Sequence, residues 1–152
     1  MSTSSNQNTK PTDPSAPTPS GDIYIHGCTV SWENASMRDV RLWRVDAANG
    51  DCIAQHNLGY SYAVGLGVTQ NYAEAARWFQ LAVNQDCAAS QHHLAQLYWM
   101  GWGIAQNNKE AARLFHLSAV QGYSEAQRFL GEFHLYGQGV PQNLEEGVRW
   151  LL

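Results

Sequence analysis

The chain has 152 residues, enough for one ordinary domain, and charged residues make up only 14% of it. Globular chains usually carry about a quarter charged residues, and here 22 asparagines and glutamines replace the missing charge. A net charge of −4 excludes the basic surface of a nucleic-acid-binding protein, and no apolar run reaches the ~20 residues that a membrane-spanning helix needs.

Residues 1–22 are rich in serine, threonine and proline, with no aromatic or large aliphatic side chain after Met1. Such a segment cannot bury enough apolar surface to offset the entropy lost on ordering, so we predict a disordered tail or tether. The chain starts without the charged and apolar regions of a secretory signal. A cytoplasmic location is expected, and a secreted or periplasmic location stays open if further residues precede Met1.

Residues 23–36 are predicted to form a short extended lead-in to a helical domain. Two β-prone runs, 23–25 and 29–32, flank a His-Gly pair. These runs either pair loosely or lie across the helical domain, since two isolated strands are marginally stable in water. Helical patterning begins near Met37.

A period of 36 residues runs through the rest of the chain. Leu58, Leu94 and Leu130 are 36 residues apart, and the first two full units are identical at 15 of 36 aligned positions. Self-similarity at this period predicts a repeat array, preceded by the second helix of an incomplete earlier unit. The predicted repeat domain spans 37–152, with units at 51–86, 87–122 and an incomplete 123–152.

Each unit is predicted to fold as two helices. Ala54, Leu58 and Tyr62 are spaced i, i+4, i+8 and mark the buried stripe of a first helix. A Gly-x-Gly corner then ends this helix, and an asparagine followed by a glutamate three residues later caps the second. These signals recur in all three units, as Gly65, Gly67, Asn71 and Glu74, as Gly101, Gly103, Asn107 and Glu110, and as Gly137, Gly139, Asn143 and Glu146.

The pattern resembles the Sel-one-like repeat, a somewhat longer relative of the tetratricopeptide repeat. In the first unit the resemblance rests on Ala54, Leu58, Gly59, Tyr62, Gly65, Gly67, Val68, Asn71, Ala75, Trp78 and Ala82. The resemblance implies an all-α fold, an α/α right-handed superhelical solenoid of about 2.5–3 helix-turn-helix repeats. It also implies a scaffold that adapts between other proteins, often in bacterial signalling, envelope assembly or host interaction.

The sequence predicts no catalytic site, metal or cofactor. The Gly-x-Gly corners lack the context of a dinucleotide fingerprint and the Gly-Lys-Ser/Thr of a P-loop. His56 and His92 are equivalent in neighbouring units but have no third ligand at metal spacing, and adjacent His92 and His93 are expected to point in different directions. Cys28, Cys52 and Cys87 are odd in number and irregularly spaced, which predicts no disulfide framework. Some members of the family carry a cysteine pair seven residues apart in each unit, and this chain has none.

The predicted partner-binding surface is the concave face, which the first helix of each unit lines in the related tetratricopeptide architecture. Aromatic, methionine and arginine side chains of this face are of the types enriched at interfaces. The alternative is that Trp99 and Tyr136 pack between adjacent units. His56 and His92 of this face are expected to titrate near neutrality, which predicts modestly tighter binding of an acidic partner toward pH 6. The predicted face comprises His56, Tyr60, His92, Gln96, Trp99, Met100, Arg128, Glu132 and Tyr136.

The predicted function is a non-catalytic protein–protein interaction module that binds a partner peptide or helix on the concave face. The alternatives are a ligand-binding or enzymatic protein using the same groove, or a structural fragment of a longer repeat array. The final helix stops at residues 148–152, which lie mid-helix in the family's pattern. Because a solenoid needs a polar last face, this end predicts self-association or a longer array.

Overall fold

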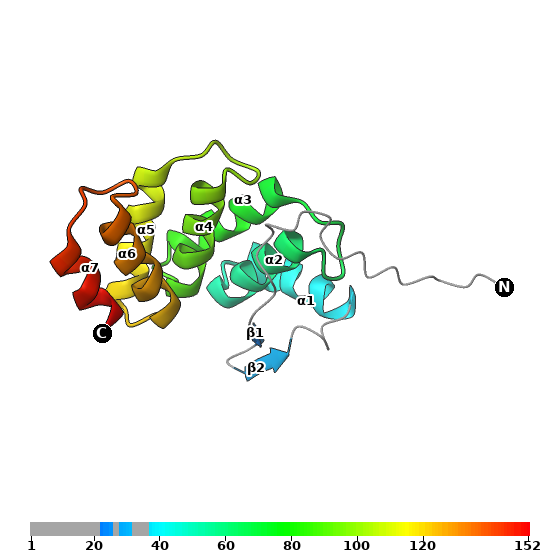
Figure 1. Ribbon diagram of the computed structural model, residues 1–152. Helices are drawn as coiled ribbons and strands as arrows, with labels where there is room; N and C mark the ends of the chain where they lie inside the picture. The colour runs from blue at the N-terminus through cyan, green and yellow to red at the C-terminus, as the bar shows by residue number, and fades with distance from the viewer. Residues whose placement is uncertain (1–21, 26–27, 32–36) are drawn as a thin grey trace.

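The computed structural model describes residues 22–25, 28–31 and 37–152, in which seven helices follow a two-stranded hairpin (Figure 1). The segment predicted to be disordered lies outside these residues, except for its last one, Asp22. Strands β1 (Asp22–Ile25) and β2 (Cys28–Ser31) pair antiparallel, with Ile23 opposite Val30. Of the two alternatives for the lead-in, the structure contains the paired one.

The helices follow the predicted period, one pair for each unit. The incomplete earlier unit contributes α1 (Met37–Ala48). The first helices of the three units are α2 (Cys52–Val64), α4 (Ala88–Met100) and α6 (Ser124–Tyr136). The second helices are α3 (Tyr72–Val83), α5 (Asn108–Val120) and α7 (Leu144–Leu151). Each helix packs against the next one along the chain, which confirms an all-α helical-repeat solenoid.

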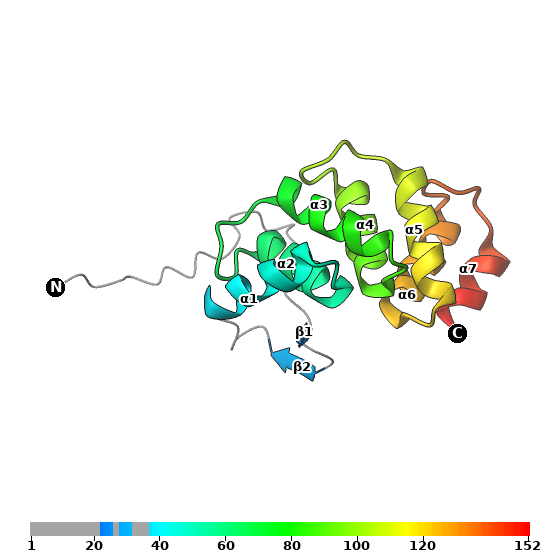
Figure 2. The ribbon, with the colours of Figure 1, turned by 180° about the vertical axis from the view of Figure 1, so that it is seen from behind.

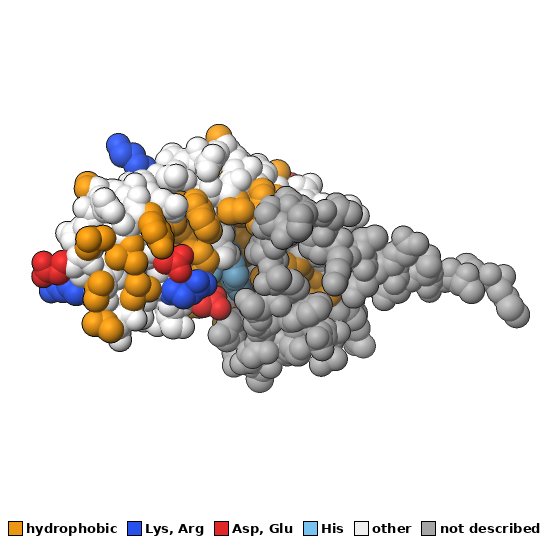
Figure 3. Space-filling view, in the orientation of Figure 1, with side chains coloured by type: hydrophobic (Ala, Val, Ile, Leu, Met, Phe, Trp, Pro, Cys, Tyr) orange, Lys and Arg blue, Asp and Glu red, His pale blue; other side chains and the backbone are white. Residues whose placement is uncertain are grey.

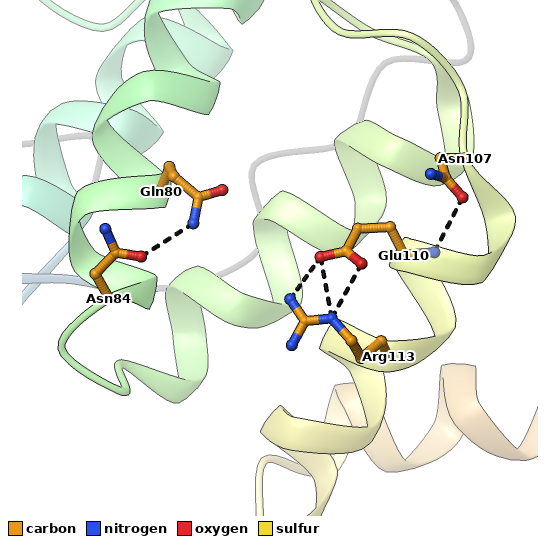
Figure 4. Close-up of polar contacts among 5 residues, drawn as sticks. All are labelled: Gln80, Asn84, Asn107, Glu110 and Arg113. Carbon is orange, nitrogen blue, oxygen red and sulfur yellow. Dashed lines mark hydrogen bonds and ion pairs between the residues drawn. The ribbon is translucent and has the colours of Figure 1, made fainter.

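The predicted helix ends are confirmed in all three units. At each second helix the asparagine N-cap accepts a hydrogen bond from the backbone N–H of the glutamate three residues on, as Asn107 does from Glu110 at 3.1 Å (Figure 4). The glutamate carboxylate turns to an arginine one turn later, here Arg113, rather than back to the cap. The first helices end at Gly65, Gly101 and Gly137, all with left-handed backbone.

Amide side chains join successive helices and account for much of the amide-rich composition. Gln55 of α2 donates to the carbonyl oxygen of Ala47 in α1 at 3.2 Å and accepts from Gln85, beyond α3, at 2.8 Å. The equivalent bond in the second unit runs from Gln121 to Gln91, at 2.9 Å. A second series closes the corners at 2.8 Å, with Gln70, Gln106 and Gln142 donating to the carbonyls of Ala63, Trp99 and Leu135.

The core runs along the array between the layer of first helices and the layer of second helices (Figures 1 and 2). Leu58, Leu94 and Leu130 occupy equivalent positions and are almost fully buried. Aromatic rings fill the space between units, with Phe115 of α5 stacked on Phe129 of α6 at 5.0 Å between ring centroids. The spacing of apolar residues in the sequence therefore predicts the core correctly.

Candidate partner-binding face

The first helices α2, α4 and α6 form one layer, whose outer surface we call the first-helix face. Ring contacts hold this layer together: Tyr60 of α2 meets His93 of α4 at 5.6 Å, and Trp99 of α4 meets Phe133 of α6 at 5.8 Å. Figure 3 shows apolar side chains on this side of the molecule, with acidic and basic side chains among them. All nine residues of the predicted binding surface belong to these three helices.

Three of the nine predicted residues lie inside the protein rather than on its surface. His56, Tyr60 and His92 are only 5%, 8% and 1% exposed. Burial, followed by the nearby His93, lowers the pKa of His56 to about 3 and places the pKa of His92 well below 6.5. The prediction that these histidines titrate near neutrality is therefore wrong, because their imidazoles stay neutral at pH 6.

The buried histidines form one cluster with His93. The ring of His93 lies 5.4 Å from that of His56 and 5.1 Å from that of His92, so the adjacent pair on α4 does not point apart. The Nε2 atom of His92 lies 3.6 Å from the carboxylate of Glu125 in α6. Within the part of the chain that the structure describes, no three His, Cys, Asp or Glu side chains are placed to hold a metal ion.

Trp99 follows the alternative prediction and packs between units. Its ring is half-buried and meets Phe129 at 5.6 Å and Phe133 at 5.8 Å, both edge-on. Gln96, also half-buried, lies with its Oε1 atom 3.2 Å from Nδ1 of His93. Met100 is half-buried at the end of the same helix. These residues of α4 therefore present only part of their surface to a partner.

The most exposed part of the predicted surface is a row on α6 formed by Arg128, Glu132 and Tyr136, which we call the α6 stripe. Arg128 pairs with Glu132 at 3.2 Å, and its guanidinium lies 4.6 Å from the ring centroid of Phe129. Tyr136 is 71% exposed, so it does not pack between adjacent units as the alternative prediction proposed. The spacing i, i+4, i+8 places all three side chains on one side of the helix.

The hairpin lies at the other end of the first-helix face. Strand β1 contacts α2, and both views place the hairpin beside α1 and α2 and far from α6 and α7 (Figures 1 and 2). The α6 stripe is therefore well separated from the hairpin.

The second helices carry a surface that serves as a control. Gln80 on α3 is exposed and donates to Asn84 at 3.2 Å, and Arg113 on α5 is exposed and pairs with Glu110 of its own helix (Figure 4). Neither of these two bonds involves a residue of a first helix. Changes at these two positions test whether binding depends on the first-helix face.

Paired helices that repeat every 36 residues, with the same caps and corners in each unit, define a helical-repeat protein. The chain belongs to the Sel1 repeat family, because the Sel1 repeat model matches residues 52–87, 88–123 and 124–152. These matches begin one residue after the units predicted from the sequence. Among curated protein sequences, none matches this chain. None of the helices in the described residues is long and apolar enough to cross a bilayer.

Two solved structures show the same architecture. One is c5321, a protective antigen of uropathogenic Escherichia coli strains with an SLR fold, at 27% identity and a TM-score of 0.73 over 80% of this chain. This chain spans only 26% of the length of c5321. The other is a Sel1 repeat protein from Oxalobacter formigenes, at 30% identity and a TM-score of 0.68, covering 73% of this chain and 85% of that one.

Proposed function

We propose that this chain is a non-catalytic interaction module that binds a peptide or helix of a partner protein along the α6 stripe of its first-helix face. Sel1 repeat proteins are generally protein–protein interaction modules and non-catalytic scaffolds. The observation that carries the proposal is the exposure of Tyr136, an aromatic side chain left in water beside an ordered ion pair.

Tyr136 and Arg128 are of the residue types that dominate the energetics of interfaces. Tyrosine buries a large area while losing the freedom of only two side-chain torsions. Arg128 is already held by Glu132 and by the ring of Phe129, so binding orders it at little further entropic cost. The stripe therefore combines an anchor for an apolar side chain with a preset pair of opposite charges.

The partner segment is expected to run along α6, since the three side chains follow one line on that helix. A helix or an extended peptide would bury an apolar residue against Tyr136 and place polar groups near Arg128 and Glu132. Half-buried Trp99 and Met100 of α4 add apolar surface to the same face. The buried residues His56, Tyr60 and His92 have almost no surface that a partner could contact.

The experiment is a site-directed photocrosslink followed by affinity measurements. A photoreactive phenylalanine analogue at position 136 should crosslink a partner that the same analogue at position 80 does not. With that partner purified, Tyr136→Ala and Arg128→Ala should each weaken binding by about 2 kcal/mol, while Gln80→Ala and Arg113→Ala leave it unchanged. Circular dichroism confirms that each variant is folded.

The opposite pattern would contradict the proposal. If Gln80→Ala or Arg113→Ala abolishes binding while Tyr136→Ala and Arg128→Ala bind like the unmodified chain, the interface lies on the second helices.

A further inference from the structure

Two cysteines from successive units meet at the starts of their first helices. Cys52 is the first residue of α2, and Cys87 is the N-cap of α4. Both are free, half-buried thiols, and Cys87 lies close enough to Cys52 to affect its ionisation. They are 35 positions apart in the sequence, one less than the period, so stacking of the two units brings them together.

Ser90 and His56 hold the Cys87 sulfur in place. The Ser90 hydroxyl donates to the Cys87 sulfur at 3.4 Å, and Nδ1 of His56 lies 2.9 Å from the same hydroxyl oxygen. Because a hydroxyl has one hydrogen, this arrangement requires the His56 N–H to donate to Ser90. The other units have Ala54 and Ala126 at this position, so the hydroxyl is particular to the unit that contains Cys87.

The Cys87 sulfur is not needed to cap its helix. The N-cap of α2, Asp51, accepts from two backbone N–H groups, whereas Cys87 makes no side-chain capping bond. A change in the covalent state of Cys87 therefore removes no cap from α4. The half-buried position also leaves both sulfurs within reach of small molecules.

We propose that Cys52 and Cys87 form a reversible disulfide that links the first unit to the second, with a low-molecular-weight disulfide as the oxidant. The thiolate of one cysteine attacks a sulfur of the small disulfide and expels one small thiolate. The other cysteine, after losing its proton, then displaces the second small thiolate from the mixed disulfide. The two protein thiols are oxidised, and the small disulfide is reduced to two thiols.

The bond differs from the cysteine pair found within single units of some family members, because it joins two units. Oxidation would restrain the first helices α2 and α4 relative to each other. Burial and the neighbouring Cys87 raise the pKa of Cys52 to about 11. Exchange is therefore best followed at pH 8 rather than at neutral pH, because more of this thiol ionises there.

The test equilibrates the purified chain with mixtures of oxidised and reduced glutathione, followed by acid quench, maleimide labelling and peptide mass mapping. The expected product is an intramolecular bond between Cys52 and Cys87, reversed by excess reduced glutathione. Closing a loop of this length should raise the melting temperature by about 5 °C or more. The Cys28→Ser variant should behave in the same way.

Matched variants separate this bond from general thiol reactivity. Cys52→Ser and Cys87→Ser should each lose the thermal shift, and Ser90→Ala should fold and close the bond several-fold more slowly. Stable glutathione adducts on both cysteines, or disulfide-linked dimers, without the intramolecular bond would overturn the proposal. A Cys28-containing bond formed in preference to the Cys52–Cys87 bond would also overturn it.

Discussion

Gly103 lies directly against the backbone of Tyr72, so the corner of the second unit rests on the first turn of α3. Any side chain at Gly103 would collide with that backbone and with the amide of Ala73. Gly139 stands in the same relation to Asn108 one unit later. Because backbone atoms cannot move aside as a side chain can, these corners set the spacing of successive units.

Gly103→Ala should lower the free energy of unfolding by about 3 kcal/mol, because it combines backbone strain with a steric clash. The φ angle of Gly103 is +71°. The matched control is Gly122→Ala, where φ is +89° but a Cβ atom would meet nothing within 4 Å, and a loss of about 1–2 kcal/mol is expected. Urea denaturation measures both, and equal losses would show that the contact with Tyr72 is unimportant.

Asp86→Gly should stabilise the protein by about 0.5–1 kcal/mol. Asp86 has a φ of +60° and occupies the position that Gly50 and Gly122 fill in the neighbouring units. Glycine relieves the left-handed strain, and its greater freedom in the unfolded chain offsets only part of that gain. Thermal denaturation tests this prediction, and a lower melting temperature for Asp86→Gly would refute it.

Gln91→Ala should cost about 2 kcal/mol of stability, whereas Gln121→Ala should cost less than about 1 kcal/mol. The Gln91 side chain is 1% exposed, so its loss leaves a cavity and removes the acceptor for Gln121. Gln121 is exposed, and water can take its place. Denaturant titration of the two single variants gives the comparison, and a larger loss for Gln121→Ala would contradict it.

Acid should destabilise the array through its buried histidines. Burial lowers the pKa of His56 to about 3 and of His93 to about 4, from 6.5, so the unfolded chain binds protons before the folded one. Stability is then full above about pH 6.5 and falls as the pH drops toward 4, by about 1–2 kcal/mol per histidine between pH 7 and 5. Denaturant titrations at the two pH values measure the loss.

The matched variants for the acid effect are His93→Phe and His116→Ala. His93→Phe copies Phe129 of the third unit and should reduce the difference in stability between pH 7 and pH 5. His116 is exposed, and its replacement should leave the difference unchanged. A His93→Phe protein with an undiminished pH dependence would show that other groups cause the acid sensitivity.

Self-association of this chain should depend on the exposed apolar side chains of α7. Leu144 and Val148 lie one turn apart and are 62% and 48% exposed. Trp150 and Leu151 are poorer test positions, because Trp150 packs edge-on against His116 at 6.0 Å and Leu151 lies against Gly131. Leu144→Ser with Val148→Ser should therefore abolish association without unpacking the helix.

Sedimentation velocity over a range of concentrations measures this association. The mass of the unmodified chain should rise with concentration from 16.9 kDa, and the double variant should stay monomeric. Val120→Ser, on the exposed surface of α5, is the control and should associate like the unmodified chain. A strict monomer for the unmodified chain would refute the prediction.

The repeat period predicted the helices, caps and corners well, because these features depend on residues close together in the chain. Asn107 and Glu110 are three positions apart, and Gly101 follows its helix directly, so local chemistry determines both ends. Local sequence could not decide whether the two β-prone runs of the lead-in pair with each other. Pairing of Ile23 with Val30 depends on the balance between strand pairing and unpaired packing on the helices, which spacing does not reveal.

The repeat period could not predict how deeply each residue of the candidate site is buried. His56, His92 and Arg128 occupy equivalent positions, yet the two histidines are buried and Arg128 is exposed. The reason is stacking: His93 of the second unit covers His56, and Phe129 of the third covers His92. The sequence of one unit determines which side chains share a helix face, but the burial of those side chains depends on the unit that follows.

The contact between Cys52 and Cys87 was missed for a related reason. A search for residues one period apart finds equivalent positions, and these two are offset by one. The sequence did contain a signal for this contact, because both cysteines lie at the starts of first helices. Cys52 begins α2, and Cys87 directly precedes α4. In a stacked array, neighbours across units are often near-equivalent rather than equivalent residues.

Amide bonds that connect one helix pair to the next are neutral and end on backbone carbonyls, as from Gln55 to Ala47 and from Gln127 to Ala119. Dissolved ions screen charges but have little effect on such bonds. The arginine–glutamate pairs that salt would weaken lie within single helices, as Arg77 and Glu74 do in α3. Ionic strength should therefore leave the spacing between successive pairs unchanged, so that the protein keeps its length and curvature from dilute buffer to concentrated brine.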